Sequence, residues 1–298
     1  MNESGWIKTY IVPMVDAEGA VGLTDDVALL AVSGPTIVTM DTLVEGRHFL
    51  PTDPIDTVGQ KLIRVNVSDI FAKGALPGEA LLSVAWPKQR SEAQFAKLMA
   101  GISRDLDTLK MALIGGDLVG TDGPLTLTLT LTGRCLGDRP VRRSEGRAGQ
   151  AVYVSGEIGW GGIGLTAARA GRASAAAERY RIPDISSAIL AKQVAEVASA
   201  SMDISDGLFL DALRLAEASG CGVRLDLEHV PLARPTDDLD QIIEQCTSGD
   251  DYQILMVADS DAPLPGFTKI GVLTESKGLQ LAYCESDVNT PSTLGFEH

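Results

Sequence analysis

The stretch from Val38 to Phe49 reads VTMDTLVEGRHF, and the interpretation of the first half of the chain starts from it. Apolar and β-branched residues from Thr36 to Val38 predict the end of a buried strand. The chain leaves this strand at Asp41, and Glu45 and His48 follow closely. Because α/β proteins usually place their chemistry where a strand end opens into a polar loop, Asp41 is the first candidate site residue.

Acidic residues also occur at the ends of four other predicted elements. The motifs are Thr24-Asp25-Asp26, Asn66-Val67-Ser68-Asp69, Gly115-Gly116-Asp117 and Met202-Asp203-Ile204-Ser205-Asp206-Gly207. A single acid in such a place is often a turn former or a helix cap, and Asp203, Ser205 and Asp206 would cap a helix that starts at Leu208. The set as a whole favours convergence on several Mg²⁺ ions, since Mg²⁺ prefers carboxylate, water and phosphate oxygens. The candidate metal acids are Asp26, Asp41, Asp69, Asp117, Asp203 and Asp206.

The composition restricts the class of protein. Of the 298 residues 45% are hydrophobic, and no apolar run reaches membrane-spanning length, so we expect a globular, soluble protein. The N-terminus lacks the pattern of a secretory signal and the four cysteines form no CxxC pair, which favours a reducing cytoplasm. A net charge of −15 argues against nucleic-acid and anionic-membrane partners. The same charge would repel a phosphorylated substrate unless cations intervene.

Hydrophobic periodicity predicts most elements of the first half. In order, these are a polar lead-in over residues 1–13, paired strands over 27–32 and 35–40, a helix over 56–75, a strand over 81–85, a capped helix over 91–111, a short buried strand over 112–114 and an alternating strand over 125–134. A hairpin of the first two strands would bring Asp26 and Asp41 together. Asp69 lies at the margin of an apolar helix stripe, where a carboxylate must be neutral, paired or bound to metal, because burying an isolated charge is costly.

The stretch from Gly137 to Gln150 is rich in Arg and Gly and is the predicted boundary between two domains, over residues 1–136 and 137–298. Its arginine cluster is either part of a solvated linker or a phosphate clamp. The cluster consists of Arg134, Arg139, Arg142, Arg143 and Arg147. In the second domain we expect strands over 151–155, 222–227, 252–258 and 268–273. We expect a glycine-rich turn and helix over 156–171, and helices over 183–200, 208–219 and 236–246.

A glycine motif in the second domain allows two interpretations. Gly159, Gly161 and Gly164 match GxGxxG between a predicted strand and helix, and Glu178 lies nineteen residues beyond the first glycine. This spacing is typical of dinucleotide binding. The motif begins in mid-chain and leaves the other acids unexplained, so we favour a glycine-rich turn that closes over a ligand or packs tightly.

Six motifs in a fixed order resemble the thiamine-monophosphate kinase family. They are DD-x-A-x-L from Asp25, MDTLVEGRHF, VNVSDIFAKGA, LIGGD, MDISDGL and SGDDYQIL, and they extend to Leu255. The family is part of a superfamily with aminoimidazole-ribonucleotide synthetase and selenophosphate synthetase. The resemblance implies an α/β (α+β) fold of two domains, each a mixed β-sheet backed by helices, and a homodimer in which the N-terminal sheets associate. The N-terminal domain would bind metal and ATP, and the C-terminal domain would complete the ATP and substrate site.

The resemblance also implies an activity and a role for single residues. The activity is Mg²⁺-dependent transfer of a phosphoryl group from ATP to the phosphate of thiamine monophosphate, without a covalent intermediate, since such transfer depends on alignment and charge neutralisation. The implied metal ligands are Asp26, Thr39, Met40, Asp41, Asp69, Asp117, Asp203 and Asp206. The implied ATP contacts are Gly116, Asp117, Arg143 and Ser205, and the implied substrate contacts are His48, Asp250 and Phe296.

Several positions depart from the family pattern. Thr24 replaces a usual glycine, Met40 replaces a threonine that normally helps to hold metal, and Asp250 replaces a glutamate in the substrate loop. The segment Arg181-Ile182-Pro183-Asp184 matches the usual RPxPR poorly. Two alternatives therefore stay open: an ATP-dependent enzyme of the same fold with a different acceptor, and a catalytically dead nucleotide-binding protein.

Overall fold

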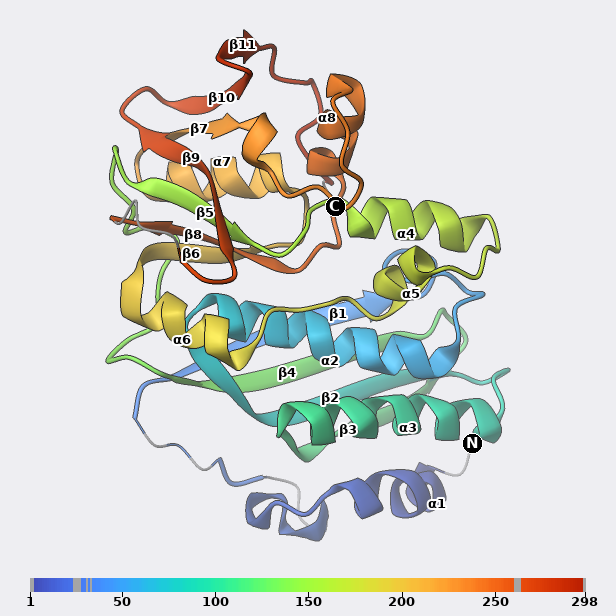
Figure 1. Ribbon diagram of the computed structural model, residues 1–298. Coiled ribbons are helices and arrows are strands. Elements are labelled where there is room, and N and C mark those ends of the chain that lie inside the picture. Colours follow the sequence, from blue (N-terminus) through green and yellow to red (C-terminus); the bar gives the residue numbers. More distant parts are fainter. Residues whose placement is uncertain (1–2, 24–27, 31, 33, 260–263, 297–298) are drawn as a thin grey trace. The chain divides into compact units, whose positions relative to one another are not determined.

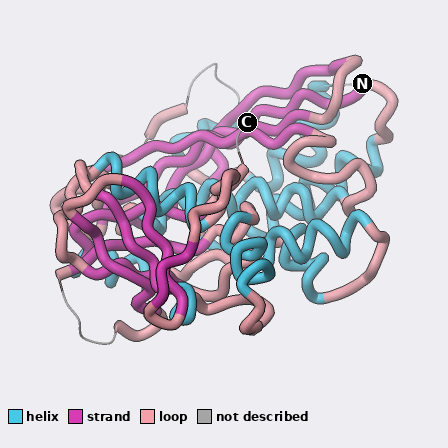
Figure 2. Tube along the Cα trace, turned by 90° about the horizontal axis from the view of Figure 1, so that it is seen from above, coloured by secondary structure: helices cyan, strands magenta, loops and turns pink. Residues whose placement is uncertain are grey.

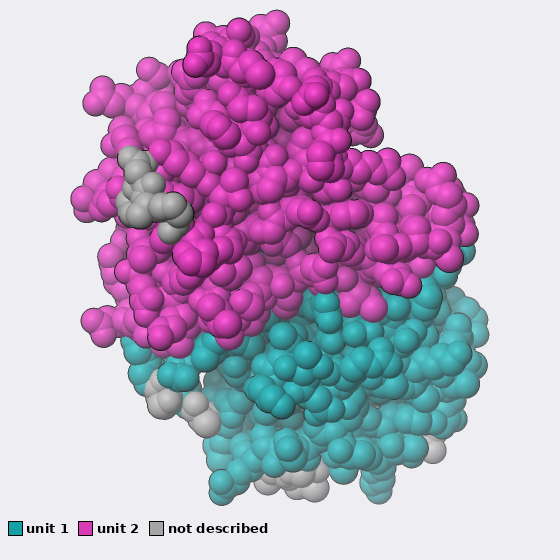
Figure 3. All heavy atoms as spheres, viewed as in Figure 1, with its two compact units in different colours: residues 1–70, 76–134 teal, residues 71–75, 135–298 magenta. Residues whose placement is uncertain are grey.

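Two compact units make up the computed structural model, which describes residues 3–23, 28–30, 32, 34–259 and 264–296 (Figure 1). Unit 1 comprises residues 1–70 and 76–134, and unit 2 comprises residues 71–75 and 135–298 (Figure 3). The chain forms two mixed β-sheets with helices, so the predicted α/β class is confirmed. The predicted domain boundary after residue 136 stays a prediction.

Unit 1 is built on a four-stranded sheet in the order β1-β4-β2-β3. The strands are β1 (Thr36–Val44), β2 (Ala75–Pro87), β3 (Ala112–Thr121) and β4 (Thr126–Cys135). β1 and β4 are antiparallel, whereas β2 and β3 are parallel. The alternation predicted for β4 is confirmed, because Leu127, Leu129 and Leu131 are fully buried and the threonines between them are not. One face of the sheet is thus apolar and covered.

Helices α2 (Ile55–Ala72) and α3 (Glu92–Leu109) cover this apolar face (Figures 1 and 2). The predicted capping box of α3 is confirmed, since Ser91 Oγ accepts the Gln94 N–H at 3.3 Å and Gln94 Oε1 accepts the Ser91 N–H at 2.9 Å. The two helices approach each other closely at Gly101, where a Cβ would lie 2.0 Å from the carbonyl oxygen of Asp56.

The N-terminal segment differs from its prediction as a polar lead-in. It forms α1 (Glu3–Trp6), a π-helical turn (Ile7–Ile11) and two 3-10 turns (Val12–Met14 and Glu18–Leu23). Trp6 is buried, and its ring lies 4.9 Å from the Phe95 ring and 6.3 Å from the Trp86 ring, centroid to centroid. The strand predicted over 27–32 is absent from the described residues 28–30 and 32, and Asp26 lies outside the described residues.

Two predicted strand ends are wrong, because both strands run further than expected. β1 continues through Asp41 to Val44, and β3 continues through Gly116 and Asp117 to Thr121. β1 is also an edge strand with one open face, on which Val38 is 67% exposed, so the prediction of a buried strand is wrong. Apolar and β-branched residues favour an extended backbone whether or not the sheet face is covered. Asp41 and Asp117 therefore project from within strands and not from loops.

Unit 2 contains a seven-stranded sheet in the order β11-β10-β7-β9-β5-β8-β6. Its strands are β5 (Ala151–Ser155), β6 (Ala198–Ile204), β7 (Gly222–Asp226), β8 (Gln253–Ala258), β9 (Phe267–Thr274), β10 (Gly278–Tyr283) and β11 (Ser286–Val288). Its helices are α4 (Trp160–Arg169), α5 (Ala175–Arg181), α6 (Ala188–Val197), α7 (Leu208–Ala218) and α8 (Leu239–Thr247), with a 3-10 turn at Leu227–His229. α7 packs against the sheet through the buried residues Leu208, Phe209 and Leu215.

The prediction of one helix over 183–200 is wrong at both ends. The helix α6 starts at Ala188, after a cap in which Ser187 Oγ accepts the Leu190 N–H at 3.4 Å, and the chain enters β6 at Ala198. Ile189, in the first turn of α6, is 73% exposed. No glycine or proline marks the point between residues 188 and 204 where the helix gives way to the strand. No helix in the described part of the chain is long and apolar enough to cross a membrane.

The contact between α2 and α3 gives a first prediction. Gly101→Ala should lower the free energy of unfolding by about 1–3 kcal/mol, because the added methyl group must push the helices apart. Gly123→Ala is the control, since a Cβ there would meet Thr121 Oγ1 at an ordinary 3.4 Å. Urea unfolding measures both variants, and equal stability of the two would contradict the packing described here.

Candidate functional site

The first candidate cluster lies where β1 runs along α2 in unit 1. Alternation along β1 directs Thr39 and Asp41 to the partly covered face, toward the helix. Thr39 Oγ1 donates to Asp69 Oδ2 at 2.6 Å, and Asp41 N–H donates to Asn66 Oδ1 at 3.1 Å. Asn66 and Asp69 are one turn apart on α2 and so share a face. These bonds bring the predicted metal ligands Asp41 and Asp69 close together.

The two carboxylates repel each other. Burial, and then the negative charge of Asp69, raises the pKa of Asp41 to about 6. A divalent cation would remove this repulsion, and carboxylate and hydroxyl oxygens are ligands that suit Mg²⁺. Within the described ranges no group of three or more His, Cys, Asp or Glu side chains is placed to hold one ion. Two carboxylates and one hydroxyl could bind a metal ion only if water and phosphate supplied its other ligands.

Met40 does not join this cluster through its side chain. It lies between Thr39 and Asp41 on β1 and projects from the open face of the sheet. A thioether is in addition a soft ligand, unsuited to Mg²⁺. The backbone carbonyl is the oxygen that Met40 could offer to a metal ion.

Asp117 and Gly116 are not brought to the cluster within one copy of the chain. They lie on β3, and β1 and β3 are opposite edges of the sheet, separated by three strand spacings or about 14 Å. Asp117 is exposed and pairs in register with Ser83 of β2. Gly116 has a local role, since a Cβ there would lie 1.8 Å from the carbonyl oxygen of Leu82.

His48 lies in the turn after β1 and is half-buried. Its Nδ1 accepts the N–H of Val44 at 3.0 Å, and its carbonyl oxygen accepts a hydrogen bond from Lys61 Nζ at 3.0 Å. Lys61 is 1% exposed and is part of α2. The helix that carries Asp69 thus also fixes the turn that carries His48.

In unit 2, the turn at Ile204–Asp206 is bonded to two other stretches of the chain. Its backbone carbonyls each accept one N–H at 2.8 Å: Ile204 from Tyr252, Ser205 from Asp250, and Asp206 from Phe296. The predicted residues Ser205, Asp206, Asp250 and Phe296 are therefore neighbours, although they are far apart in sequence. Asp203, at the end of β6, precedes the turn and is 8% exposed.

Two residues that the sequence analysis missed organise this turn. Asp211 Oδ2 accepts the N–H groups of Ser205 and Asp206 at 3.0 and 2.9 Å, and burial raises the pKa of Asp211 above its ordinary value. Arg214 forms ion pairs with both Asp206 and Asp211. The Asp–Arg spacing of three residues on a helix was the available signal. The alternative that Asp203, Ser205 and Asp206 cap α7 is wrong, because Gly207 is the N-cap and no side chain caps it.

The predicted arginine cluster has mixed surroundings. Arg139 is paired with Glu145 at 2.6 Å. Arg143 is exposed, and its carbonyl oxygen accepts the Ser219 hydroxyl at 2.8 Å, which fixes its backbone. Its contact with ATP stays a prediction.

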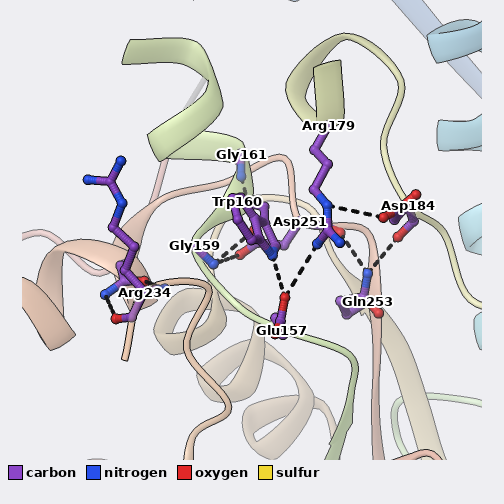
Figure 4. A network of polar contacts seen from close by, with 10 residues as sticks. Glu157, Gly159, Trp160, Gly161, Arg179, Asp184, Arg234, Asp251 and Gln253 are labelled. Atoms are coloured by element: carbon purple, nitrogen blue, oxygen red, sulfur yellow. Dashed lines mark hydrogen bonds and ion pairs between the residues drawn. The ribbon is translucent and has the colours of Figure 1, made fainter. Parts of the chain in front are cut away.

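The glycine motif packs tightly, as the favoured interpretation predicts. A Cβ at Gly161 would lie 2.0 Å from the Gly249 carbonyl oxygen, and one at Gly164 would lie 2.3 Å from that of Ala176. The backbone N–H groups of Gly159 and Gly161 donate hydrogen bonds to the carboxylate of Asp251, with N···O distances of 2.9 to 3.2 Å (Figure 4). A dinucleotide pyrophosphate would need these same N–H groups, so the buried Asp251 excludes dinucleotide binding by this motif. Sequence reasoning missed Asp251.

Comparisons with known proteins identify the family of the chain. The chain matches the AIR synthase related protein, N-terminal domain, at residues 24–135, and the AIR synthase related protein, C-terminal domain, at residues 147–283. Thiamine-monophosphate kinase of Caulobacter vibrioides is 36% identical over 94% of this chain and 85% of its own length. The crystal structure of thiamine monophosphate kinase from Aquifex aeolicus is 30% identical, covers 86% of this chain and 90% of its own, and superposes with a TM-score of 0.75. The structure of AaThiL complexed with AMPPCP and TMP is also 30% identical, covers 87% and 86%, and has a TM-score of 0.76.

The two sheets and the two matched domains define an AIR synthase related protein. Within that class, the chain belongs to the thiamine-monophosphate kinase family, and it is an enzyme of the phosphotransferase type. The resemblance inferred from the six sequence motifs is confirmed.

The bond between Asp251 and the glycine turn gives a second prediction. Burial raises the pKa of Asp251 from 3.8 to about 7, so the native protein binds more protons than the unfolded chain between about pH 4 and 7. The free energy of unfolding should therefore fall as pH rises through this window, because the ionised carboxylate is buried. Asp251→Asn should make this fall smaller, as measured by urea unfolding at pH 5, 6, 7 and 8. Parallel curves for the two proteins would contradict the prediction.

Proposed function

We propose that this protein transfers the γ-phosphoryl group of ATP to the phosphate of thiamine monophosphate, giving thiamine diphosphate and ADP, with Mg²⁺ as the metal. The observation that carries the proposal is the oxygen cluster of Thr39, Asp41 and Asp69, in which two close carboxylates call for a cation. Family membership supports the choice of donor and acceptor. A cytoplasmic location, where ATP is made available, is part of the same proposal.

The chain's own residues supply binding and alignment. Thr39, Asp41, Asp69 and the Met40 carbonyl hold Mg²⁺, which when bound neutralises phosphate charge. Asp26, Asp203 and Asp206 are assigned to further ions, and Gly116, Arg143 and Ser205 to ATP, where a guanidinium recognises phosphate oxygens by paired hydrogen bonds. Because transfer needs alignment and charge neutralisation, no residue of the chain has to act as a covalent carrier.

The acceptor is assigned to His48, Asp250 and Phe296. Since His48 Nδ1 accepts the Val44 N–H, the neutral ring carries its proton on Nε2 and offers that N–H to a phosphate oxygen. Phe296 is 52% exposed, and its aromatic ring is of the kind that stacks on a ring of the acceptor. Asp250 Oδ1 accepts the Tyr252 hydroxyl at 2.8 Å, which fixes the direction of its carboxylate.

A second copy of the chain is also part of the proposal. Asp41 and Asp117 lie on the two opposite edge strands of unit 1, so one chain does not bring them together. An association in which β1 of one copy meets β3 of the other would do so. The open face of the sheet exposes apolar side chains, as surfaces that associate do. These side chains are Val38, Met40, Leu81 and Val119.

A different phosphorylated acceptor is the second candidate. Asp250 has one methylene less than the glutamate usual in the family, and its backbone adopts the left-handed conformation, with φ +65°. Turnover of ATP with Mg²⁺ and another phosphorylated acceptor, but not with thiamine monophosphate, would select this candidate. Binding of ATP without turnover of any acceptor would select the catalytically dead protein.

Substitution of the two neighbouring carboxylates tests their assignment as metal ligands. Asp41→Asn and Asp69→Asn should each lower kcat for thiamine monophosphate about 100-fold or more, because each removes a metal carboxylate. Asp41→Asn should leave the melting temperature unchanged or higher, because it also removes a like-charge repulsion. Near-normal turnover by both folded variants at saturating Mg²⁺ would refute the assignment. Asp122→Asn, at an exposed turn, is the control and should keep full activity.

Mixing two inactive variants tests whether Asp41 of one copy of the chain meets Asp117 of a second copy. Asp41→Asn and Asp117→Asn are each expected to be inactive alone. If the two acids meet between copies, a mixed dimer has one intact site, and equal co-expression should restore about a quarter of wild-type activity. Activity that stays at the level of the single variants, in a sample shown to contain mixed dimers, would mean that the acids do not meet between copies.

A further inference from the structure

A cavity in unit 2 extends beyond the acceptor residue Asp250. Its volume is about 490 Å³, within the range of roughly 300–1,000 Å³ found for small-molecule sites. The start of α4, the end of α5 and the segment after it, and the loop at Asp250–Gln253 line it. The site roles proposed above use only Asp250 from this lining.

The charge of the lining indicates what the cavity binds. Of the described residues that line it, four are acidic and one, Arg179, is basic. The acids are Glu157, Asp184, Asp250 and Asp251. Such a wall repels phosphate and attracts a cation. The phosphate of an acceptor therefore belongs outside the cavity, and a positively charged group of the acceptor belongs inside.

Trp160 provides an aromatic face in this acidic surrounding (Figure 4). Its indole Nε1–H donates to Glu157 Oε2 at 2.7 Å, which orients the ring. The guanidinium of Arg179 lies over the ring, 4.4 Å from its centroid. The same guanidinium is paired with Glu157 at 3.4 Å and with Asp184 at 3.3 Å. The structure thus already holds a cation on this aromatic face, between two carboxylates.

We infer that the cavity binds the cationic heteroaromatic ring of the acceptor, with its positive charge on the face of Trp160 and with Glu157 and Asp184 as counter-ions. The inference rests on the proposed function, because the thiazolium ring of thiamine monophosphate is such a cation. The thiazolium ring is flat and its charge is delocalised, as in the guanidinium of Arg179, which already lies on this face. Trp160 is accordingly a specificity-determining residue for the acceptor.

Arg179 occupies the same face and so competes with the ring. Its side chain is 37% exposed and its two partners are half-exposed or more, so the guanidinium can turn toward water at little cost. Removal of this guanidinium frees the face and leaves the two carboxylates without a cation. Trp160 and Arg179, although in contact, should therefore have opposite effects on acceptor binding.

The test compares Trp160→Leu, Trp160→Phe and Arg179→Gln with the wild type, all checked for folding by thermal melting. Trp160→Leu should raise KM for thiamine monophosphate about 3- to 30-fold, with kcat and KM for ATP unchanged. Trp160→Phe should restore most of the loss, since it keeps an aromatic face. Arg179→Gln should lower KM for thiamine monophosphate. An unchanged acceptor KM in Trp160→Leu, or a rise of equal size in Arg179→Gln, would overturn the inference.

Calorimetry separates this inference from the proposed function. Thiamine, which has no phosphate, should bind the wild type about 3- to 30-fold more tightly than its uncharged carbon isostere, and Trp160→Leu should abolish this preference. If thiamine monophosphate is not turned over but this preference is found, the proposed function fails and the cavity assignment holds. Equal binding of thiamine and its isostere by the wild type would overturn the cavity assignment whatever the activity.

Discussion

The candidate metal site of unit 1 depends on the repulsion between Asp41 and Asp69. The fold holds the two carboxylates close together, although the pKa of Asp41 rises to about 6 as a result of burial and of the neighbouring charge. Thr39 and Asn66 fix them there through one hydroxyl and one amide. A protein that keeps like charges together in this way is preorganised for a cation, because the cost of bringing the ligands together is met during folding.

Unit 2 positions its residues by a different means. The turn at Ile204–Asp206 accepts backbone N–H groups from Asp250, Tyr252 and Phe296. Asp211 and Arg214 hold the turn itself. These main-chain bonds do not depend on the side chain at position 250. Asp250 stands where the family usually has glutamate, so its carboxylate reaches less far. The same main-chain bonds hold the loop that carries it.

Local patterns predicted those parts of the fold whose causes are local. Helical periodicity and the capping box gave α2 and α3, and strict alternation gave β4. The extent of β1 and β3 could not be predicted, because polar residues and glycines are allowed in edge strands, and the pairing partner decides where a strand ends. The same holds for the switch from α6 to β6, which no glycine or proline marks.

The candidate site was predictable in its residue types but not in its arrangement. Motif spacing singled out the acids, yet Asp117 lies at the sheet edge opposite to Asp41, which only the strand order reveals. Asp211 and Asp251 were missed because they act by accepting backbone N–H groups from turns that are adjacent only in the fold. Trp160 could not be recognised either, because its role depends on Arg179 and Glu157, which adjoin it only after α4 and α5 pack together.

Anomalous diffraction from crystals grown with Mn²⁺ and a non-hydrolysable ATP analogue tests the metal site assigned to Asp41 and Asp69. We expect a metal peak within about 2.2 Å of carboxylate oxygens of both residues, with the Met40 carbonyl as a further ligand. Metal peaks in the same crystals that leave both carboxylates without a metal contact would contradict this assignment.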